Sequence, residues 1–303
     1  MAENSFQPRS DLHIHSGHSH DVTNGTTLAS IRDESRAAGI RQIGITEHLN
    51  NRKTDAHVRA SRAEYDALDD RENFQFAVEA STLREWDLQI EQERGEAATP
   101  YGHYEGGPRQ PAQVYLPDEI REEMNFDYIV AGAHWLLGVS PGDTEAVVRN
   151  WHEQQMCIAT HPHVDVLAHP WLWCTVILEP QLKVLALPWL HDFGVIPRSM
   201  HEELAAAARE HHTAVEISAV SYFEEIDARS TGQEDEFFPS LPREQYIEFH
   251  QLLKEAGVKL SIGSDSHGPG YNDSKVLRLA EPLETLKLTD ADLWHPLVKS
   301  PTT

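Results

Sequence analysis

Asp11-Leu-His-Ile-His15 is a short apolar alternation that runs directly into a second group of imidazoles, Ser16-Gly-His-Ser-His-Asp21. The alternation predicts a β-strand, and on a strand His13 and His15 point to the same side because they are two residues apart. Two imidazoles on one side can hold one metal ion. A strand that ends in such ligands is typical of the carboxyl-terminal mouth of an α/β barrel, where that fold keeps its chemistry.

Later strand predictions end in the same kinds of residue, which matters because His-x-His alone is weak in a chain with 19 histidines. Apolar runs are predicted as strands over 41–46, 74–79, 126–133, 164–168, 213–218 and 259–263. Their ends carry His48, Glu79, His134, His169, Glu216, and Asp265 with His267. Helices are predicted between them over 27–38, 56–69, 143–160, 201–211 and 243–256. This alternation favours one parallel, barrel-like α/β sheet.

Two stretches interrupt the alternation. Residues 83–125 are rich in Gly and Pro, and we expect an insertion or lid without regular structure there. Residues 171–200 are apolar with no clear period and are predicted to form a second loop over the mouth. The tail from Tyr271 onward is expected to pack outside the barrel. Because nothing between these parts resembles a linker, we expect a single domain over residues 1–303.

The composition limits the classes of partner. With 25 Lys and Arg against 49 Asp and Glu, the formal net charge is -24, which disfavours nucleic acid because binding to phosphate backbones needs clustered basic residues. Met1-Ala-Glu-Asn-Ser5 lacks the basic and apolar parts of a secretion signal, and no apolar run is long enough to span a bilayer. We therefore expect a cytoplasmic protein with a small-molecule substrate and no membrane or nucleic-acid partner, and the sequence leaves a homo-oligomer open.

The polar residues at the strand ends form the candidate metal site. Carboxylates and imidazoles brought to one mouth would desolvate and repel one another unless cations neutralised them. Nitrogen and oxygen donors without thiols suit two or three divalent ions such as Zn²⁺, Mn²⁺ or Fe. Such ions convert water to metal-bound hydroxide near neutral pH, so a hydrolase is expected. The candidate ligands are His13, His15, His20, His48, Glu79, His134, His169, Asp265 and His267.

These motifs, taken together, resemble the PHP (polymerase and histidinol phosphatase) superfamily. The resemblance rests on Asp11-Leu-His-Ile-His15, Thr46-Glu-His48, Glu79, Gly132-Ala-His134, Asp165-Val-Leu-Ala-His-Pro170 and Gly263-Ser-Asp-Ser-His267, and it spans about residues 10 to 270. It implies a distorted (β/α)7 TIM-like barrel with loop insertions over its carboxyl-terminal mouth, a trinuclear metal centre and phosphoesterase activity.

The resemblance also implies how the ligands divide. His13, His15 and Asp265 would hold a first metal, and Glu79 would bridge it to a second that His134 and His169 complete. His20, His48 and His267 would hold the third. Spacing after His15 varies in the family, so His18 or Asp21 can take the place of His20. An Asp commonly precedes the histidine of Thr46-Glu-His48; here Glu47 stands in its place and is expected to orient a ligand.

The leading hypothesis is a metal-dependent hydrolase of a small phosphomonoester, such as histidinol phosphate, a nucleotide or another metabolite phosphate. Glu79 would hold the hydroxide between two ions, and His48, His169 or Asp265 would protonate the leaving oxygen. Trp135 and Trp171, next to His134 and His169, could form an apolar wall for the leaving group. Arg84, Arg52 and Arg198 are candidates for binding phosphate.

Two alternatives stay open. The first alternative is a metal-dependent hydrolase that cleaves an amide, lactone, phosphonate or phosphodiester. The few basic residues and the tryptophans near the mouth are compatible with it. The second is a binding or regulatory module with a vestigial site, which the presence of all nine candidate ligands disfavours.

Overall fold

The protein is described by a computed structural model that covers residues 8–22, 26–140, 142–172, 175–178, 181–184, 189, 192–219, 221, 243–267 and 273–296. Its centre is a parallel sheet of seven strands in a single path, which confirms the predicted α/β barrel class. In order around the sheet these are β1 (Ser10–Ile14), β2 (Gln42–Leu49), β3 (Phe74–Leu83), β5 (Ile129–Gly132), β6 (Val166–Leu167), β9 (Ala214–Ser218) and β10 (Leu260–Gly263).

The sheet nearly closes on itself between its first and last strands. A bridge joins Ile14 to Ser266 just beyond β10. Two backbone hydrogen bonds cross the same seam, from His15 N to Ser266 O at 3.1 Å and from Asp265 N to His13 O at 2.8 Å. The first and last strands of the sheet are therefore joined at the mouth of the barrel.

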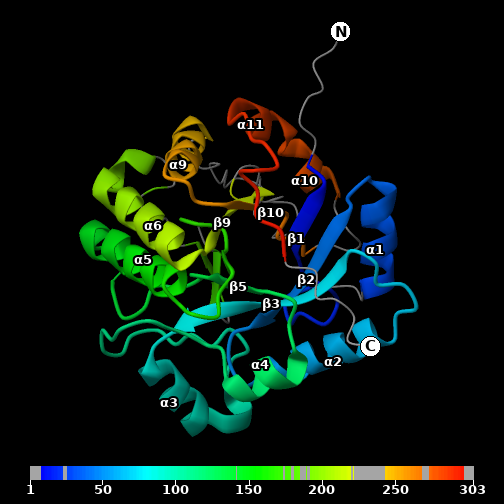
Figure 1. Cartoon of the computed structure of the whole chain (residues 1–303). Coiled ribbons are helices and arrows are strands. Elements are labelled where there is room, and N and C mark those ends of the chain that lie inside the picture. Colours follow the sequence, from blue (N-terminus) through cyan, green and yellow to red (C-terminus); the bar gives the residue numbers. More distant parts are fainter. Residues whose placement is uncertain are drawn as a thin grey trace.

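Helices lie around the outside of the strands (Figure 1). Their bounds agree with the predictions to within a few residues, and their ends follow ordinary capping rules. Thr27 caps α1 by accepting a hydrogen bond from Ser30 N, and Asp143 caps α5 by accepting one from Ala146 N. Gly39, with φ of +89°, follows α1. The helices are α1 (Leu28–Ala37), α2 (Asp55–Asp66), α5 (Thr144–Ala159), α6 (Arg198–His211) and α9 (Arg243–Glu255).

The prediction that residues 83–125 lack regular structure is wrong in part. This insertion contains helix α3 (Glu85–Arg94), a 3-10 turn (Gly95–Ala97), the short strand β4 (Gln113–Val114), which pairs antiparallel with β3, and helix α4 (Asp118–Met124). Helix α3 forms because Asp87 accepts a hydrogen bond from Arg84 N at 2.9 Å and so caps the first turn. The longest stretch of the insertion without a helix or strand is the Gly- and Pro-rich part, residues 98–112.

Residues 171–200 are only partly described. They include an antiparallel hairpin separate from the barrel, β7 (Thr175–Leu178) with β8 (Gln181–Val184). Helix α6 begins at Arg198, three residues earlier than predicted. The tail forms α10 (Asp273–Arg278) and α11 (Ala280–Thr285). Beyond them Trp294 packs against Tyr128 with ring centroids 5.3 Å apart, so the tail does contact the inner wall of the barrel.

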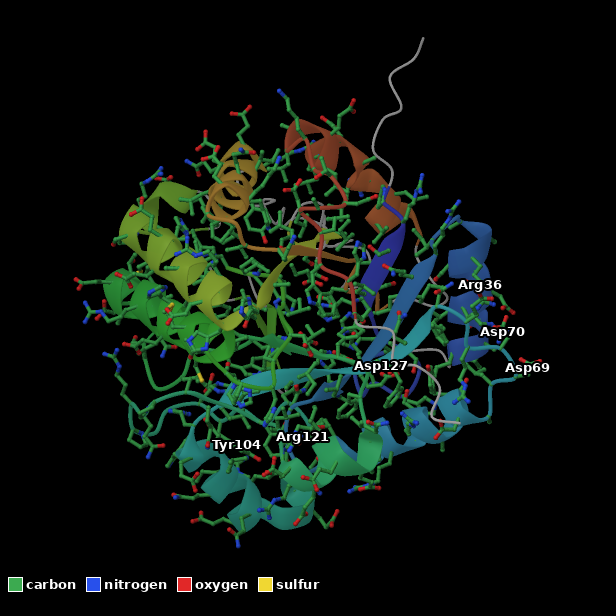
Figure 2. All side chains as sticks on the ribbon, in the orientation of Figure 1. Arg36, Asp69, Asp70, Tyr104, Arg121 and Asp127 are labelled. Atoms are coloured by element: carbon green, nitrogen blue, oxygen red, sulfur yellow. The ribbon has the colours of Figure 1, made fainter. Side chains whose placement is uncertain are left out.

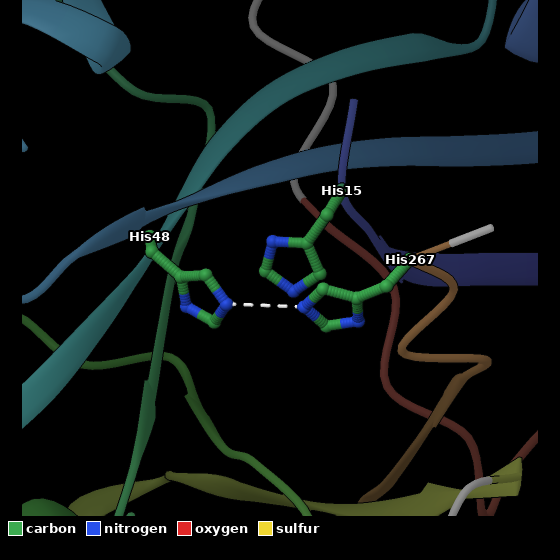
Figure 3. A group of neighbouring side chains, drawn as sticks. All are labelled: His15, His48 and His267. Atoms are coloured by element: carbon green, nitrogen blue, oxygen red, sulfur yellow. Dashed lines mark hydrogen bonds between the residues drawn. The ribbon is translucent and has the colours of Figure 1, made fainter. Parts of the chain in front are cut away.

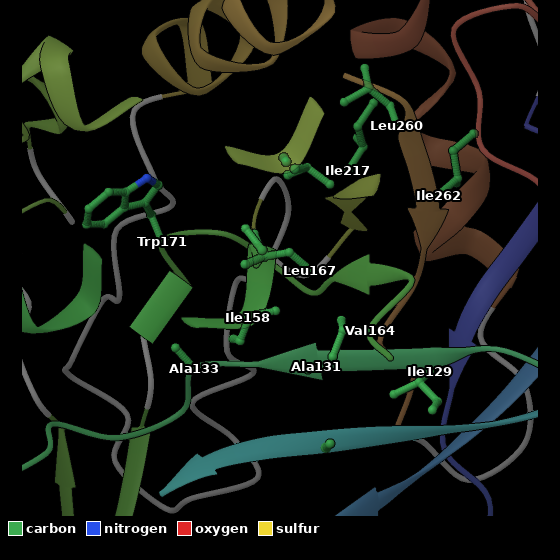
Figure 4. Packing of buried hydrophobic residues seen from close by; sticks show 14 of the residues in the cluster. Ile129, Ala131, Ala133, Ile158, Val164, Leu167, Trp171, Ile217, Leu260 and Ile262 are labelled. Atoms are coloured by element: carbon green, nitrogen blue, oxygen red, sulfur yellow. The ribbon is translucent and has the colours of Figure 1, made fainter. Parts of the chain in front are cut away.

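Two apolar clusters hold this arrangement together. The larger lies between the strands and the helices and includes Ala131, Leu167, Ile217 and Ile262 from neighbouring strands (Figure 4). The smaller comes from strands and their ends and includes Leu12, Ala77, Tyr128, Val130, Val166, Ala168 and Ala214. Strands covered on both faces explain why the strand segments are almost continuously apolar in sequence.

Charged side chains point outward from the helices (Figure 2). Arg36 of α1 pairs with Asp70 beyond α2, with Nη1 2.6 Å from Oδ2, and this exposed pair adds little to stability. In the described part of the chain, no helix has the length and apolar character needed to cross a membrane.

Close packing inside the barrel makes Gly44 of β2 a sensitive position. A Cβ added there would overlap the phenol of Tyr128, whose hydroxyl donates a 2.6 Å hydrogen bond to Leu12 O. We predict that Gly44→Ala lowers the free energy of unfolding by about 1–3 kcal/mol, as overpacking in a core does. Urea unfolding followed by circular dichroism measures this value.

Gly142→Ala is the matched control, because a Cβ there would contact only Ser140 Oγ at 3.8 Å. Its free energy of unfolding should stay close to that of the unchanged protein. Equal effects of the two substitutions would mean that the contact between Gly44 and Tyr128 does not constrain the barrel.

Candidate metal centre

The strand ends bring the predicted ligands into one buried cluster. His13 lies in β1, and His48 and Glu79 lie in β2 and β3. His15 and His20 follow β1, and the remaining four, His134, His169, Asp265 and His267, follow β5, β6 and β10. His169 and Asp265 have positive φ values of +25° and +52°. Such backbone conformations are unfavourable for residues other than glycine and gather at functional sites. The fold therefore holds these two side chains in place at some cost.

Four ligand atoms surround one point at the end of β1. The Nε2 atoms of His13 and His15 are 3.2 Å apart. Glu79 Oε2 is 3.4 Å from the first and 3.5 Å from the second, and Asp265 Oδ1 is 3.5 and 3.2 Å from them. A tetrahedral zinc site with bonds of about 2.0–2.1 Å has ligand atoms about 3.3–3.4 Å apart. These five separations are close to those of a tetrahedral divalent ion, and His13, His15 and Asp265 form one group of candidate ligands whose atoms all lie within 4.8 Å of one another.

The hydrogen bonding of this group supports the same fit. Glu79 Oε2 and Asp265 Oδ1 are buried and make no well-formed hydrogen bond within the described ranges, although Glu79 Oε2 lies 2.8 Å from His48 Nδ1. A buried carboxylate oxygen left in this way is costly, and a cation bound between the imidazoles and the carboxylates removes the cost.

The other oxygen of Glu79 faces a second pair of imidazoles. Glu79 Oε1 lies 3.0 Å from His134 Nε2 and 2.8 Å from His169 Nε2. Ser81, two residues after Glu79 on the same strand, contacts the remaining nitrogen of His134, with Oγ 2.8 Å from Nδ1. Glu79 thus lies between two groups of candidate ligands, as a bridging carboxylate would.

A third group lies on the other side of His15. His48 Nε2 and His267 Nε2 are 3.1 Å apart (Figure 3). Asp21 Oδ2 is 3.0 Å from the first and 3.3 Å from the second. The ring of His15 stacks on the rings of His48 and His267, with both pairs of centroids 4.1 Å apart. Three ligand atoms at these separations can hold a further ion.

Of the residues left open for this third group, the structure places Asp21 nearest the two imidazoles. His18 points elsewhere, because its Nε2 lies 2.6 Å from Glu64 Oε2. The ring of His20 lies beside His48 with centroids 5.5 Å apart, and neither of its nitrogens has a hydrogen-bond partner within the described chain. Burial lowers the pKa of His20 to about 4, so its ring is neutral at neutral pH.

Burial and charge act against each other across the cluster. Burial raises the pKa of the Glu79 carboxyl, but the imidazoles of His134 and His13 outweigh it and hold that pKa well below its usual range. The pKa of the Asp265 carboxyl is likewise held well below its usual range despite burial, chiefly by the imidazole of His13. Burial lowers the pKa of His15 well below its usual value. The carboxylates are therefore ionised and His15 is neutral, whereas neighbouring carboxylates outweigh burial and raise the pKa values of His13 and His48 well above their usual range. A metal ion held by these two imidazoles would displace their protons.

Glu216, on β9, contacts two of the candidate ligands, His13 and His169. Its Oε1 is 2.8 Å from His13 Nδ1, and its Oε2 accepts a 2.7 Å hydrogen bond from His169 N. The side chain is 1% exposed. A carboxylate on the far nitrogen of a ligating histidine fixes its ring orientation and tautomer. Glu216 therefore positions His13 and His169.

Glu47 has a similar part through a serine. It accepts hydrogen bonds from the hydroxyls of Ser16, of Ser19 at 2.7 Å and of Ser61 at 2.9 Å. Ser19 Oγ is also 3.2 Å from His15 Nδ1. The orienting function expected of Glu47 thus has a route to His15.

Two glycines make room for the ligands. A Cβ on Gly132 would lie 2.6 Å from His169 Cε1 and 2.9 Å from Glu79 Oε1. A Cβ on Gly263 would overlap Glu216 and lie 2.6 Å from His13 Cβ. Both sites need the close backbone approach that only glycine permits.

Arg84 is not placed to bind substrate. It is fully buried, and its guanidinium donates to Asp87 and to the carbonyl oxygens of Tyr104, Gly106 and Pro108. Because these partners occupy the guanidinium, Arg84 fastens the insertion and leaves no donor for a phosphate. Its position just after Glu79 suggested the substrate contact, but the side chain turns away from the centre.

Arg198 and Trp171 also differ from their predictions. Arg198 lies at the exposed start of α6 and pairs with Glu202, with Nε 2.8 Å from Oε1. Trp171 is fully buried, packs against Trp189 with centroids 5.3 Å apart, and appears at the edge of the core in Figure 4. Its ring is therefore part of the core, whereas Trp135 stays beside the cluster, with its ring 6.1 Å from His134.

Comparisons with known proteins add little about the chemistry. No family model matches the sequence, and no curated protein matches it. Solved structures with a similar course of the chain include A. niger ochratoxinase, at 16% identity with 93% of this chain and 69% of that chain covered and a TM-score of 0.43. Another is an uncharacterized protein at 14% identity, with 92% and 72% covered and a TM-score of 0.36. The structure by itself shows an α/β barrel whose buried His, Asp and Glu groups can hold metal ions.

We predict that Glu216→Gln weakens zinc binding about 10–100-fold, the usual effect of removing the partner of a ligating histidine. The amide keeps the size of the side chain but loses the charge that orients His13. Competition with a chromophoric chelator measures the affinity. Glu203→Gln is the control, because Glu203 pairs with His152 and is 61% exposed. Equal affinities of the two variants would contradict the positioning role.

We also predict that Asp21→Asn lowers the number of bound ions per chain by one, because an amide is a much weaker ligand than a carboxylate. His20→Asn and His18→Gln should leave the number unchanged. Elemental analysis of each dialysed protein gives the metal content. Loss of an ion from His20→Asn alone would assign the third group to His20 instead.

Proposed function

We propose that this chain is a metal-dependent hydrolase of small phosphomonoesters that uses Zn²⁺, Mn²⁺ or Fe. The observation that carries the proposal is the group of four ligand atoms of His13, His15, Glu79 and Asp265, joined through Glu79 to a second pair of imidazoles. Buried ligand groups that share one carboxylate are the arrangement expected for hydrolytic centres with more than one ion.

The residues divide into three sets in this proposal. His13, His15, Glu79 and Asp265 hold the first ion, and Glu79, His134 and His169 hold the second. Asp21, His48 and His267 hold the third, with His20 beside them. When bound, such ions activate a water molecule for attack and neutralise the charge that develops on the electrophile.

The remaining chemistry belongs to the chain itself. Glu79 fixes the spacing of the two sets of imidazoles, because each of its oxygens faces one set. Glu216 and Glu47 hold the ligands in the correct orientation. Of the three residues predicted to supply the proton to the leaving oxygen, His48 or His169 takes this role, because the carboxyl of Asp265 is ionised. The depth of the cluster excludes bulk water, which strengthens each electrostatic interaction within it.

A second candidate function is a metal-dependent hydrolase that uses the same ions but cleaves an amide, lactone, phosphonate or phosphodiester. It is favoured by the positions of the arginines. Within the described residues, Arg84 is occupied by the insertion and Arg198 pairs with Glu202 at the surface, so neither provides the guanidinium that phosphate recognition commonly uses.

The test is phosphate release from a panel of phosphomonoesters, including histidinol phosphate and nucleotides. Chelator-stripped protein should be inactive, and added Mn²⁺ or Zn²⁺ should restore release. Glu79→Gln should stay folded and lose activity by at least about 10³-fold, because the bridging charge is removed.

Glu203→Gln serves as the matched carboxylate control and should keep full activity. Near-normal activity of Glu79→Gln would contradict the bridging role. A protein that carries its metals, releases no phosphate and hydrolyses amides or lactones would establish the second candidate function.

A further inference from the structure

The irregular part of the insertion, residues 98–112, is called the lid segment here. It brings two aromatic side chains to the metal centre. The ring of Tyr101 meets that of His20 edge-on at 4.7 Å and that of Trp135 at 5.7 Å. The ring of His103 stacks on Trp135 at 5.7 Å with an angle of 7° between the planes. Tyr101 and His103 are half-buried, and Trp135 beneath them is buried.

The lid segment is fastened to the end of β2 on one side. Asn50 Nδ2 donates to Pro100 O at 3.3 Å, and Asn51 Nδ2 donates to Thr99 O at 2.7 Å. Gly102 has φ of +73°, and a Cβ there would lie 2.5 Å from Asn50 O. Asn50 Oδ1 in turn accepts a 2.5 Å hydrogen bond from Ser81, the partner of the ligand His134. One set of bonds thus joins the lid segment to the metal centre.

Arg84 and Asp87 fasten the other side. Arg84 donates to Tyr104 O at 3.0 Å and to Gly106 O at 2.7 Å. Asp87 Oδ1 accepts a hydrogen bond from Tyr104 N at 3.2 Å. The Arg84 guanidinium also lies 4.6 Å from the ring of Trp86. Because this ion pair is fully buried, the segment is held in one conformation without any helix or strand of its own.

The chemistry of the resulting surface is aromatic and uncharged. Burial lowers the pKa of His103 to about 4, so its ring is neutral at neutral pH. Tyr101, His103 and Trp135 therefore form a neutral aromatic group beside a strongly polar centre in a chain with a net charge of -24. Flat rings at 4.5–7 Å separations bind further rings by edge and offset contacts.

We propose that Tyr101 and His103 of the lid segment, together with Trp135, form the subsite for the leaving group and select an aromatic or planar one. This inference rests on the proposed function for the bond that is broken. Tyr101 and His103 contact the leaving group, and the buried ring of Trp135 supports their rings from beneath. Arg84, Asp87, Asn50 and Asn51 are positioning residues that hold the lid segment.

The first experiment measures selectivity. The ratio of kcat/KM for phenyl phosphate to that for glycerol phosphate is determined in the metal-loaded protein. Tyr101→Ala and Trp135→Ala should each lower this ratio by about tenfold, the size of one lost aromatic contact. Tyr101→Phe keeps the ring and should keep the ratio. An equal loss of activity on both substrates would overturn the proposal.

The second experiment does not depend on turnover. Calorimetry compares the binding of phenylphosphonate and methylphosphonate to the metal-loaded protein, and phenylphosphonate should bind about tenfold more tightly. Tyr101→Ala should remove this preference, and thermal unfolding checks that the variant is folded. Suppose that no phosphoester is hydrolysed, but phenylphosphonate binds more tightly than methylphosphonate and Tyr101→Ala removes the difference. The subsite is then supported and the phosphatase function is contradicted. If phosphoesters are hydrolysed and no preference exists, the subsite fails alone.

Discussion

The organisation of this barrel depends on the burial of charge at its mouth. Glu79 and Asp265 are carboxylates with almost no contact with solvent, and each faces several imidazoles at 2.8–3.5 Å. Placing so many polar groups in a dry interior is costly, and the cost falls only when opposite charges and hydrogen bonds meet every atom. The close backbone at Gly132 and Gly263, the positive φ at His169 and the buried Glu216 all serve this one requirement.

Much of the fold could be predicted because parallel barrel strands are apolar throughout and end in polar residues. Each of the predicted strands corresponds to an observed one, and the helices predicted over 27–38 and 243–256 end just before Gly39 and Gly257, both of which have positive φ. The insertion was harder to predict. Its helix α3 depends on a cap by Asp87, a contact between side chain and backbone that the surrounding Gly and Pro residues obscured.

The candidate metal ligands were predictable for a similar reason, but the residues around them were not. The end of a strand locates a ligand, so His13, His15, Glu79 and Asp265 could be found from position alone. Arg84 also follows a strand, yet a side chain at the end of a strand can turn toward a loop, and sequence does not show which way it turns. Asn50, Asn51 and Tyr101 could not be found, because their contacts join residues that are 48 to 81 positions apart in the sequence.

The seam between β1 and β10 has a consequence for the molecule as a whole. The backbone groups that join the two strands belong to His13, His15 and Asp265, whose side chains also point at one another. An ion bound by these three side chains would link the first and last strands of the barrel, because it would connect residues about 250 positions apart in the sequence. Occupation of the centre and closure of the barrel are thus linked equilibria, and a ligand of the closed ring adds to its resistance to unfolding. The free energy of unfolding would then depend on the concentration of that ligand as well as on the packing of the chain.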